Sequence, residues 1–347
     1  MEIRVLSEDF DVLGLLEPYE SLVWNDRYQE YGDFEAKVPA SAERLALLTV
    51  DRYLQRDDSE HVMIIETVRV ETDHESGDHI VLKGRSLESI LQRRVIKTQI
   101  AVSGAFQNGA ASLLNACIIS PSDSPRKIAN FRFVASTDTA VTTPTLSTRF
   151  KGDNLYDVIQ AGCSVNNLGF KVTLADKIFS FSLYAGKDRS YSQTANPFVI
   201  FSPKFDNMLS SDYEESVEGY KNVCYALGTV SDGSTSSSVL AESYYGSSSP
   251  SGVKRREIYS EVSGSFASTE QLKERGKESL EDNPATKRFE AEADTSMMFR
   301  YGKDFFLGDI VQVENEYGMK ARARVTEVIT THDASGFSCY PTFTFLE

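Results

Sequence analysis

Apolar and polar residues alternate near the end of the chain in the pattern of half-buried strands. The alternation runs through residues 319–326 and resumes at 337–345 after a cluster of turn residues at 333–336. A period of two places successive side chains on opposite faces of a strand. A further strand-like run at 309–314 precedes them. The pattern predicts three antiparallel strands joined by short turns.

The N-terminal region shows the same plan. Residues 52–56, 61–70 and 79–84 have strand-like composition and are separated by polar turns. A short echo relates the two regions: Ile-Glu-Thr-Val at 65–68 is similar to Thr-Glu-Val-Ile at 326–329, and each is followed by Ser-Gly. So short an echo also arises by chance, so internal duplication and coincidence both stay open.

The rest of the chain divides by pattern into further segments. Residues 1–97 are predicted as a first antiparallel β-barrel, which includes short helices after Ser41 and Ser86. Residues 98–200 are predicted as a smaller α+β domain. Its predicted helices cover 108–118 and 153–161, and Gly162 is expected to end the second helix.

A second β-barrel is predicted from two separated segments, 201–230 and 288–347. Between them, 231–287 is Ser-rich and contains a capping box at 268–271, which predicts an inserted domain with a helix. The predicted fold class is therefore mainly β with α+β insertions, built from two related antiparallel β-barrel modules and two smaller mixed domains.

Composition narrows the classes of function. The 347 residues carry a formal net charge of −15, which disfavours tight binding to nucleic-acid phosphates but not the passage of DNA through a channel. The four cysteines lie far apart and are expected to be reduced and buried. We expect no transmembrane segment and no signal peptide, because no apolar run has the required length.

Residues with catalytic or metal-binding chemistry do not converge in the sequence. His74 and His79 flank a polar turn, where a hairpin tip explains them better than a metal site does. Gly186-Lys187 lacks the other residues of a phosphate-binding loop, and no nucleophile motif is present. We therefore expect no enzyme activity, no catalytic residue, no metal and no cofactor.

Three cations on one face of a predicted strand form a candidate interface. Lys320, Arg322 and Arg324 repel one another unless water or a partner relieves them. An acidic neighbouring subunit and a solvated outer face both explain this stripe, and we favour the solvated face.

Several short segments together give the chain a family resemblance. It resembles the baseplate-hub, or tail-associated, proteins at the tail tip of long-tailed, siphovirus-like bacteriophages and prophages. The segments follow one another along almost the whole chain, and the residues that stand out in them are Trp24, Arg27, Tyr28, Gly32, Phe34, Gly84, Arg85, Gly186, Asp188, Arg189, Asn222, Gly308 and Asp309. The resemblance gives these residues structural roles, because the family has no catalytic residues to transfer.

The resemblance implies an assembly as well as a fold. It implies a homotrimer in the virion, in which two related barrels per subunit adapt a hexameric tail tube to a threefold tip and form part of the DNA ejection channel. The implied partners are the distal tail protein ring, the tape-measure protein, and a tail fibre or a spike that binds the receptor. The implied location is the virion tail tip, after assembly in the cytoplasm of the bacterial host.

Two alternatives come from other classes. One is a carbohydrate-binding β-protein of the cell or tail surface, which the absence of a concentrated Trp/Tyr platform disfavours. The other is a cell-wall-degrading glycan hydrolase, which would need a carboxylate pair that the sequence does not single out.

Overall fold

The computed structural model describes residues 2–73, 77–208, 210–231, 235–292 and 298–346. The chain forms two compact units. Unit 1 consists of Met1–Ser211 and Glu290–Glu347, and unit 2 consists of Asp212–Phe289. Unit 2 is thus one continuous segment between the two parts of unit 1.

An 11-stranded sheet dominates unit 1. Its order is β13-β19-β20-β3-β4-β7-β6-β5-β1-β2, and β21 pairs with the other side of β20. Its strands are β1 (Ile3–Leu6), β2 (Val12–Leu15), β3 (Ser21–Arg27), β4 (Asp33–Pro39), β5 (Tyr53–Arg56), β6 (Val62–Asp73), β7 (Gly77–Ser86), β13 (Ile200–Phe201), β19 (Ile310–Glu314), β20 (Lys320–Asp333) and β21 (Gly336–Leu346). The three predicted C-terminal strands and the three N-terminal ones are confirmed within this sheet.

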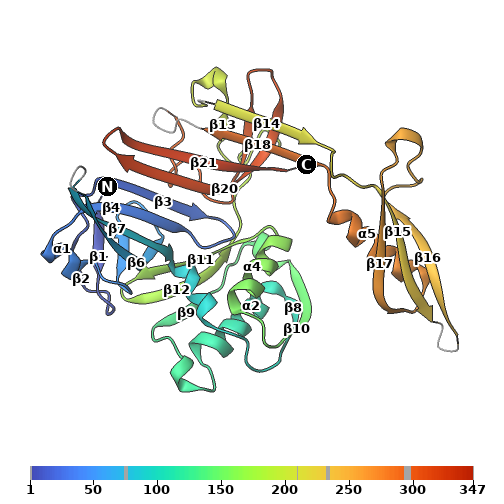
Figure 1. The fold of residues 1–347 in the computed structure, drawn as a ribbon, viewed down its shortest axis with the longest axis horizontal. Helices are drawn as coiled ribbons and strands as arrows, with labels where there is room; N and C mark the ends of the chain where they lie inside the picture. The colour runs from blue at the N-terminus through green and yellow to red at the C-terminus, as the bar shows by residue number, and fades with distance from the viewer. Residues whose placement is uncertain (1, 74–76, 209, 232–234, 293–297, 347) are drawn as a thin grey trace. The chain divides into compact units, whose positions relative to one another are not determined.

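The two ends of the chain share this sheet. β20 pairs antiparallel with β3, from Glu327 opposite Arg27 to His332 opposite Leu22. Figure 1 shows the red strands β20 and β21 beside the blue strand β3. The large sheet continues from the C-terminal region into the N-terminal region, and its strand order is open. None of the sheets among the described residues closes into a barrel. The protein is mostly β, as predicted, but separate closed barrels are not seen.

The two hairpins suspected of common origin share a local irregularity. β6 and β7 pair antiparallel with a register shift between Ile65 and Thr67. β20 and β21 pair in the same way, with a shift between Val325 and Glu327. A β-bulge of this kind bends the strand and increases its twist. Each hairpin also follows a short antiparallel partner, β5 for the first and β19 for the second.

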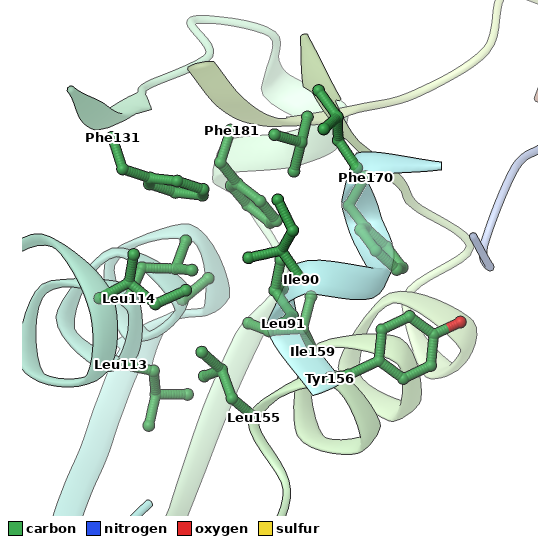
Figure 2. Packing of buried hydrophobic residues seen from close by; sticks show 14 of the residues in the cluster. Ile90, Leu91, Leu113, Leu114, Phe131, Leu155, Tyr156, Ile159, Phe170 and Phe181 are labelled. Atoms are coloured by element: carbon green, nitrogen blue, oxygen red, sulfur yellow. The ribbon is translucent and has the colours of Figure 1, made fainter. Parts of the chain in front are cut away.

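A helix-containing layer packs beside the large sheet in unit 1. Its elements are β8 (Ile100–Ala105), α2 (Phe106–Leu114), β9 (Phe131–Val134), α3 (Thr139–Thr142), β10 (Thr145–Phe150), α4 (Leu155–Val165), β11 (Gly169–Ala175) and β12 (Ile178–Tyr184). The short helix α1 (Ala42–Leu47) lies elsewhere, against β2 of the large sheet. β11 and β12 pair antiparallel and form a hairpin. Figure 2 shows the apolar core here, in which Leu113 of α2 lies beside Leu155 of α4; both belong to one buried cluster with Leu114, Ile90 and Phe181.

One helix boundary in this layer is predicted wrongly. Gly162 lies inside α4 instead of ending it, because α4 continues to Val165. A Cβ at Gly162 would lie 2.3 Å from the ring of Phe106. The glycine is therefore explained by close packing between α4 and α2, which sequence alone does not distinguish from a helix end.

Unit 2 places three strands against one helix. Its elements are β15 (Val223–Ser231), β16 (Ser236–Tyr244), β17 (Glu257–Phe266) and α5 (Thr269–Glu281), and the strands β14 (Ser210–Ser216) and β18 (Thr286–Glu292) pair where the chain enters and leaves. The predicted N-cap is confirmed, because Ser268 Oγ accepts from Gln271 N at 3.3 Å. The reciprocal bond differs from a capping box by one residue, since Gln271 Oε1 accepts from Ala267 N at 3.0 Å and not from Ser268 N.

The strand at 221–228 was expected in the second β-module but lies in unit 2. There β15 pairs antiparallel with β16 and parallel with β17. Cys224 and Ala226 of β15 pack with Leu272 and Leu280 of α5 in a small core of its own. The apolar side chains of β15 are buried in this core. Their alternation in the sequence predicts a half-buried strand but does not indicate which sheet the strand joins.

Candidate functional site

The residues of the family resemblance gather mostly in unit 1, around the end of β3. Tyr28 is fully buried there, and its ring lies against two glycines. A Cβ would lie 2.3 Å from the ring at Gly169 and 2.2 Å at Gly308. The Tyr28 hydroxyl donates to Asn167 O at 3.0 Å. Burial raises the pKa of Tyr28 to about 12, so the phenol stays a neutral donor.

Two segments distant in sequence touch through their backbones beside this ring. A Cβ at Gly186 would lie 1.9 Å from the carbonyl of Gly308. This distance is far below any real contact, so the segment after β12 and the segment before β19 can meet only through glycine. Gly308 also has a φ of +85°, a conformation that glycine adopts without strain.

A buried ion pair fixes the same contact. Arg189 Nε donates to Asp309 Oδ2 at 2.6 Å, and Asp309 is 2% exposed. The other carboxylate oxygen accepts from Lys187 N at 2.7 Å, and Oδ2 also accepts from Phe306 N at 3.1 Å. Asp309 thus ties the segment of Lys187 and Arg189 to its own loop with charge-assisted hydrogen bonds.

Asp188 organises the loop that follows. Its carboxylate accepts from Ser190 N at 2.9 Å and from Ser192 Oγ at 3.1 Å. Its carbonyl accepts from Asn196 Nδ2 at 2.9 Å. The hydrogen bonds from the two serines, with Arg322 nearby, lower the pKa of Asp188 although desolvation opposes them.

The remaining N-terminal residues of the resemblance hold the large sheet together. The Trp24 ring lies 6.1 Å from that of Phe34. Glycine is required at two places in the sheet, since a Cβ would lie 2.2 Å from Asn25 O at Gly32 and 1.7 Å from Ile64 O at Gly84.

Two arginines connect neighbouring strands across the sheet. Arg27 of β3 pairs with Glu327 of β20 at 2.7 Å and also with Asp33 of β4. Arg85 of β7 donates to both oxygens of Glu66, at 2.6 and 2.9 Å. The two glutamates are the ones that align in the sequence echo, and each receives an arginine from an adjacent strand.

Asn222 is not brought together with the others. It lies in unit 2, where its Oδ1 accepts from Arg256 N at 2.8 Å and its Nδ2 donates to Lys254 O at 2.8 Å. Its role there is to close the turn before β17 against the start of β15.

The cationic stripe finds partners inside the chain. Lys320 pairs with Glu314 at 3.5 Å, and Arg322 with Asp188 at 3.3 Å. Arg324 donates to Gly308 O at 2.9 Å, and its guanidinium lies 5.6 Å from the centre of the Tyr28 ring. Each of the three cations therefore has a partner within the chain.

A cleft of about 460 Å³ opens beside these contacts. Its lining includes Tyr184, Gly186, Asp309 and Tyr301, together with His61. The walls carry both cations and carboxylates, so the cleft has no strong preference for one sign of charge.

Sequence reasoning missed a buried polar cluster next to the cleft. Asp26, Arg56, His61 and Glu88 are each less than a tenth exposed. Trp24 Nε1 donates to Asp26 Oδ1 at 3.0 Å, and Glu88 Oε1 lies 3.4 Å from His61 Nδ1. The signal for Asp26 was present, because it continues the inward-facing alternation of β3.

The charges in this cluster shift one another's protonation. Desolvation lowers the pKa of His61, but the carboxylates of Asp26 and Glu88 outweigh it and raise the pKa to about 9. Burial raises the pKa of Glu88, but the hydrogen bond and charge of His61 outweigh it, so that this pKa is lowered. Burial raises the pKa of Asp26. Glu88 Oε1 also accepts from Val172 N at 2.8 Å, which ties the large sheet to β11.

The chemistry of the site is that of a structural junction. Within the described ranges, no group of three His, Cys, Asp or Glu residues could hold a metal ion. His79 Nδ1 lies 2.9 Å from Glu20 Oε1, whereas His74, its suggested companion at a metal site, lies outside the described residues. None of the helices that the structure describes is both long and apolar enough to cross a membrane.

The fold is that of a mostly β protein whose distant segments are held together at this junction. The chain belongs to the Siphovirus ReqiPepy6 Gp37-like protein family, whose family model matches residues 2–343. The resemblance found in the sequence is thereby confirmed at the level of phage and prophage tail proteins. No curated protein matches the chain in sequence.

Solved structures share the fold over almost the whole chain. A 43 kDa tail protein of prophage MuSo2 from Shewanella oneidensis has a TM-score of 0.62 at 12% identity and covers 99% of this chain and 98% of its own. A tail protein from Neisseria meningitidis MC58 has a TM-score of 0.58 at 12% identity, with 100% and 96% covered. Prophage tail protein gp18 from Listeria monocytogenes has a TM-score of 0.56 at 12% identity, with 99% and 94% covered.

A structure from another system is also similar. The Escherichia coli c3393 protein is described as a component of the type VI secretion system with structural similarity to the T4 tail proteins gp27 and gp5. It has a TM-score of 0.51 at 8% identity, and the match covers 100% of this chain and 77% of that protein.

Proposed function

We propose that the protein is a baseplate-hub component at the phage tail tip. The observation that carries the proposal is that the fold of a tail protein spans the whole chain. The residues that stood out in the sequence, such as Gly186, Gly308 and Asp309, make contacts that stabilise this fold. The likeness of a related fold to T4 gp27 and gp5 supports a place near the tip of the tail.

The proposed role is that of a trimeric symmetry adaptor. Three copies, each with two similar β-modules, present six similar units to a hexameric tail tube or distal tail ring while keeping a threefold tip. The two bulged hairpins, β6–β7 and β20–β21, support this duplication, because bulge, short partner strand and arginine-bound glutamate recur in both. We assign the first module to residues 1–97 and the second to those parts of 201–230 and 288–347 that belong to unit 1.

The proposed partners follow from this position. The distal tail ring lies on one side, the end of the tape-measure protein inside, and a fibre or spike beyond. DNA passes only transiently, and a net charge of −15 per copy keeps it from adhering to the channel wall. The protein is assembled in the bacterial cytoplasm and remains in the virion.

A reconstruction of the tail tip tests this function. We expect threefold density for the protein around a central channel, in contact with the distal tail ring, and two modules per subunit that superpose. A complex of purified protein with the distal tail protein is the simpler substitute. A sixfold or monomeric arrangement, or a position away from the tip, would contradict the proposal.

The proposed role is also non-enzymatic. Incubation of the purified protein with host peptidoglycan should release no more soluble fragments than buffer does, with a muralytic enzyme as the positive control. Release that is lost when one carboxylate is replaced would favour the cell-wall-degrading alternative.

A further inference from the structure

The large sheet of unit 1 ends in three strands, and two of them are protected against pairing with another chain. β13 has only two residues, so it offers little backbone. β21 is long but contains Pro341, which lacks a backbone N–H and interrupts the donor row of the strand. Both devices are common in natural proteins, because an open strand edge is a template for another strand.

The third end strand, β2, has neither device. Val12, Leu13 and Leu15 are 61%, 45% and 43% exposed, and β2 contains no charge or proline. Gly14 faces Leu47 of α1, with 3.3 Å from a Cβ position to the leucine methyl, so one face of β2 is packed. No strand among the described residues pairs with the outer edge of β2.

The backbone of β2 is oriented for strand addition. Leu16 N donates to Ile3 O of β1 at 2.9 Å. Because N–H groups alternate in direction along a strand, the N–H of Leu15 points to the open edge. An added strand would therefore gain backbone hydrogen bonds and cover exposed aliphatic side chains at the same time.

Acidic residues at both ends of β2 define the chemistry of the partner. Glu8 and Asp9 precede the strand and Glu17 follows it, all exposed. None of the three forms an ion pair with a described residue, whereas Asp11 is paired with Lys177 at 2.6 Å.

A groove of about 600 Å³ begins at the same acidic end. Its lining combines the carboxylates of Glu8 and Asp9 with the rings of Phe10, Tyr53 and Phe179. The lysine in the lining, Lys177, is paired with the third carboxylate, Asp11, so Glu8 and Asp9 remain for a partner. The ring centres of Phe10 and Phe179 are 5.1 Å apart, and those of Phe10 and Tyr53 are 5.0 Å apart. Carboxylates beside aromatic faces suit a guanidinium or ammonium group, which gains both an ion pair and a cation–π contact.

We propose that β2 is the docking edge for an extended aliphatic segment with basic ends, supplied by a different protein. A second copy of the chain fits poorly, because antiparallel pairing of two β2 strands would place Glu8 and Asp9 of one copy opposite Glu17 of the other. The proposal does not depend on the position of the protein in the tail.

Fluorescence anisotropy with the full-length protein tests the edge. The probe is a fluorescein-labelled peptide of alternating Val and Thr with two Lys or Arg residues at each end. A second peptide has the same core with Glu ends, and a third has the basic ends with alternate backbone amides methylated. We expect the basic peptide to bind at least about tenfold more tightly than either control, one tenfold step in Kd being a readily measured difference.

Two variants locate the binding. Leu15→Lys places a charge on the edge, as natural sheets do, and should weaken binding of the basic peptide by about tenfold. Val70→Lys makes the same change at a 47% exposed position of β6, away from β2, and should bind as the wild type does. The emission of Trp24 checks that both variants are folded.

Three results would overturn the proposal. They are no binding of the basic peptide, equal binding of the basic and acidic peptides, and unchanged binding by Leu15→Lys. Self-association of the wild type that Leu15→Lys abolishes, measured by analytical ultracentrifugation, would make a second copy the occupant and would refute the basic partner.

Discussion

The buried pair between Arg189 and Asp309 allows a quantitative test of the junction. In Asp309→Asn the side-chain shape is kept, but the charge opposite Arg189 is lost. The amide can still accept from Lys187 N through its oxygen, but its NH₂ group would then face two donors, Arg189 Nε and Phe306 N. The variant therefore leaves the buried guanidinium of Arg189 without a counter-ion and the N–H of Phe306 without an acceptor.

The structure gives the expected magnitude. Arg189 and Asp309 side chains are 9% and 3% exposed, so water cannot replace the lost partner. Removing one member of a buried pair costs about 3–5 kcal/mol of unfolding free energy. The control is an exposed pair in the large sheet, Lys83 and Glu35, whose side chains are 2.7 Å apart. Glu35→Gln should lower the unfolding free energy by at most about 0.5 kcal/mol.

Urea unfolding followed by tryptophan emission is the assay. Trp24 is the single tryptophan of the chain and is fully buried in the large sheet, so its emission reports on unit 1. Arg189→Met and the double variant complete a double-mutant cycle, in which we expect a coupling energy of about 1–3 kcal/mol. A loss below about 1 kcal/mol for Asp309→Asn, or coupling near zero, would refute the assignment of Asp309 as the residue that holds the junction.

Three further predictions concern unit 1 and its boundary. His61 has a pKa raised from 6.5 to about 9 in the folded protein, so the stability that it contributes is fully present below pH 6.5 and is lost as the pH rises through 9. The unfolding free energy, measured by urea unfolding at several pH values, should therefore fall less steeply between these pH values in His61→Gln than in the wild type. Gly308→Ala should lower the unfolding free energy by at least about 2 kcal/mol more than Gly318→Ala does. Both glycines have positive φ, but only a Cβ at Gly308 would lie 2.2 Å from an aromatic ring, that of Tyr28; equal thermal shifts for the two variants would show that this contact does not matter. Replacing residues 212–289 by a short Gly-Ser linker should leave the unfolding midpoint of unit 1, followed by Trp24 emission, within the error of the wild type, and a large decrease would show that the two units stabilise each other.

The sequence alone predicted much of the local structure. Alternation predicted the hairpin strands of the large sheet, and the capping box at Ser268 predicted the start of α5. These features depend on neighbours within a few residues, so a short window contains the physical cause. The family resemblance likewise depended on residues whose spacing is visible in the chain.

The partners of each strand were decided only by the tertiary structure. The pattern of β15 satisfied two possible sheets equally well, and its place in unit 2 follows from packing against α5. Gly162 shows the same limit, because a glycine that ends a helix and one that admits the ring of Phe106 are identical in sequence.

The junction itself required the fold. Gly186 and Gly308 stand 122 residues apart, like Lys187 and Asp309, and nothing local indicates that their backbones touch. The buried cluster around His61 was only partly visible: alternation along β3 places Asp26 on the inward face, but nothing local indicates that His61 and Glu88 lie beside it. Alternation, turns and caps arise from interactions within a few residues and are determined by the sequence directly; sheet order, close backbone contacts and buried charge pairs arise from interactions between distant residues and exist only once the chain is folded.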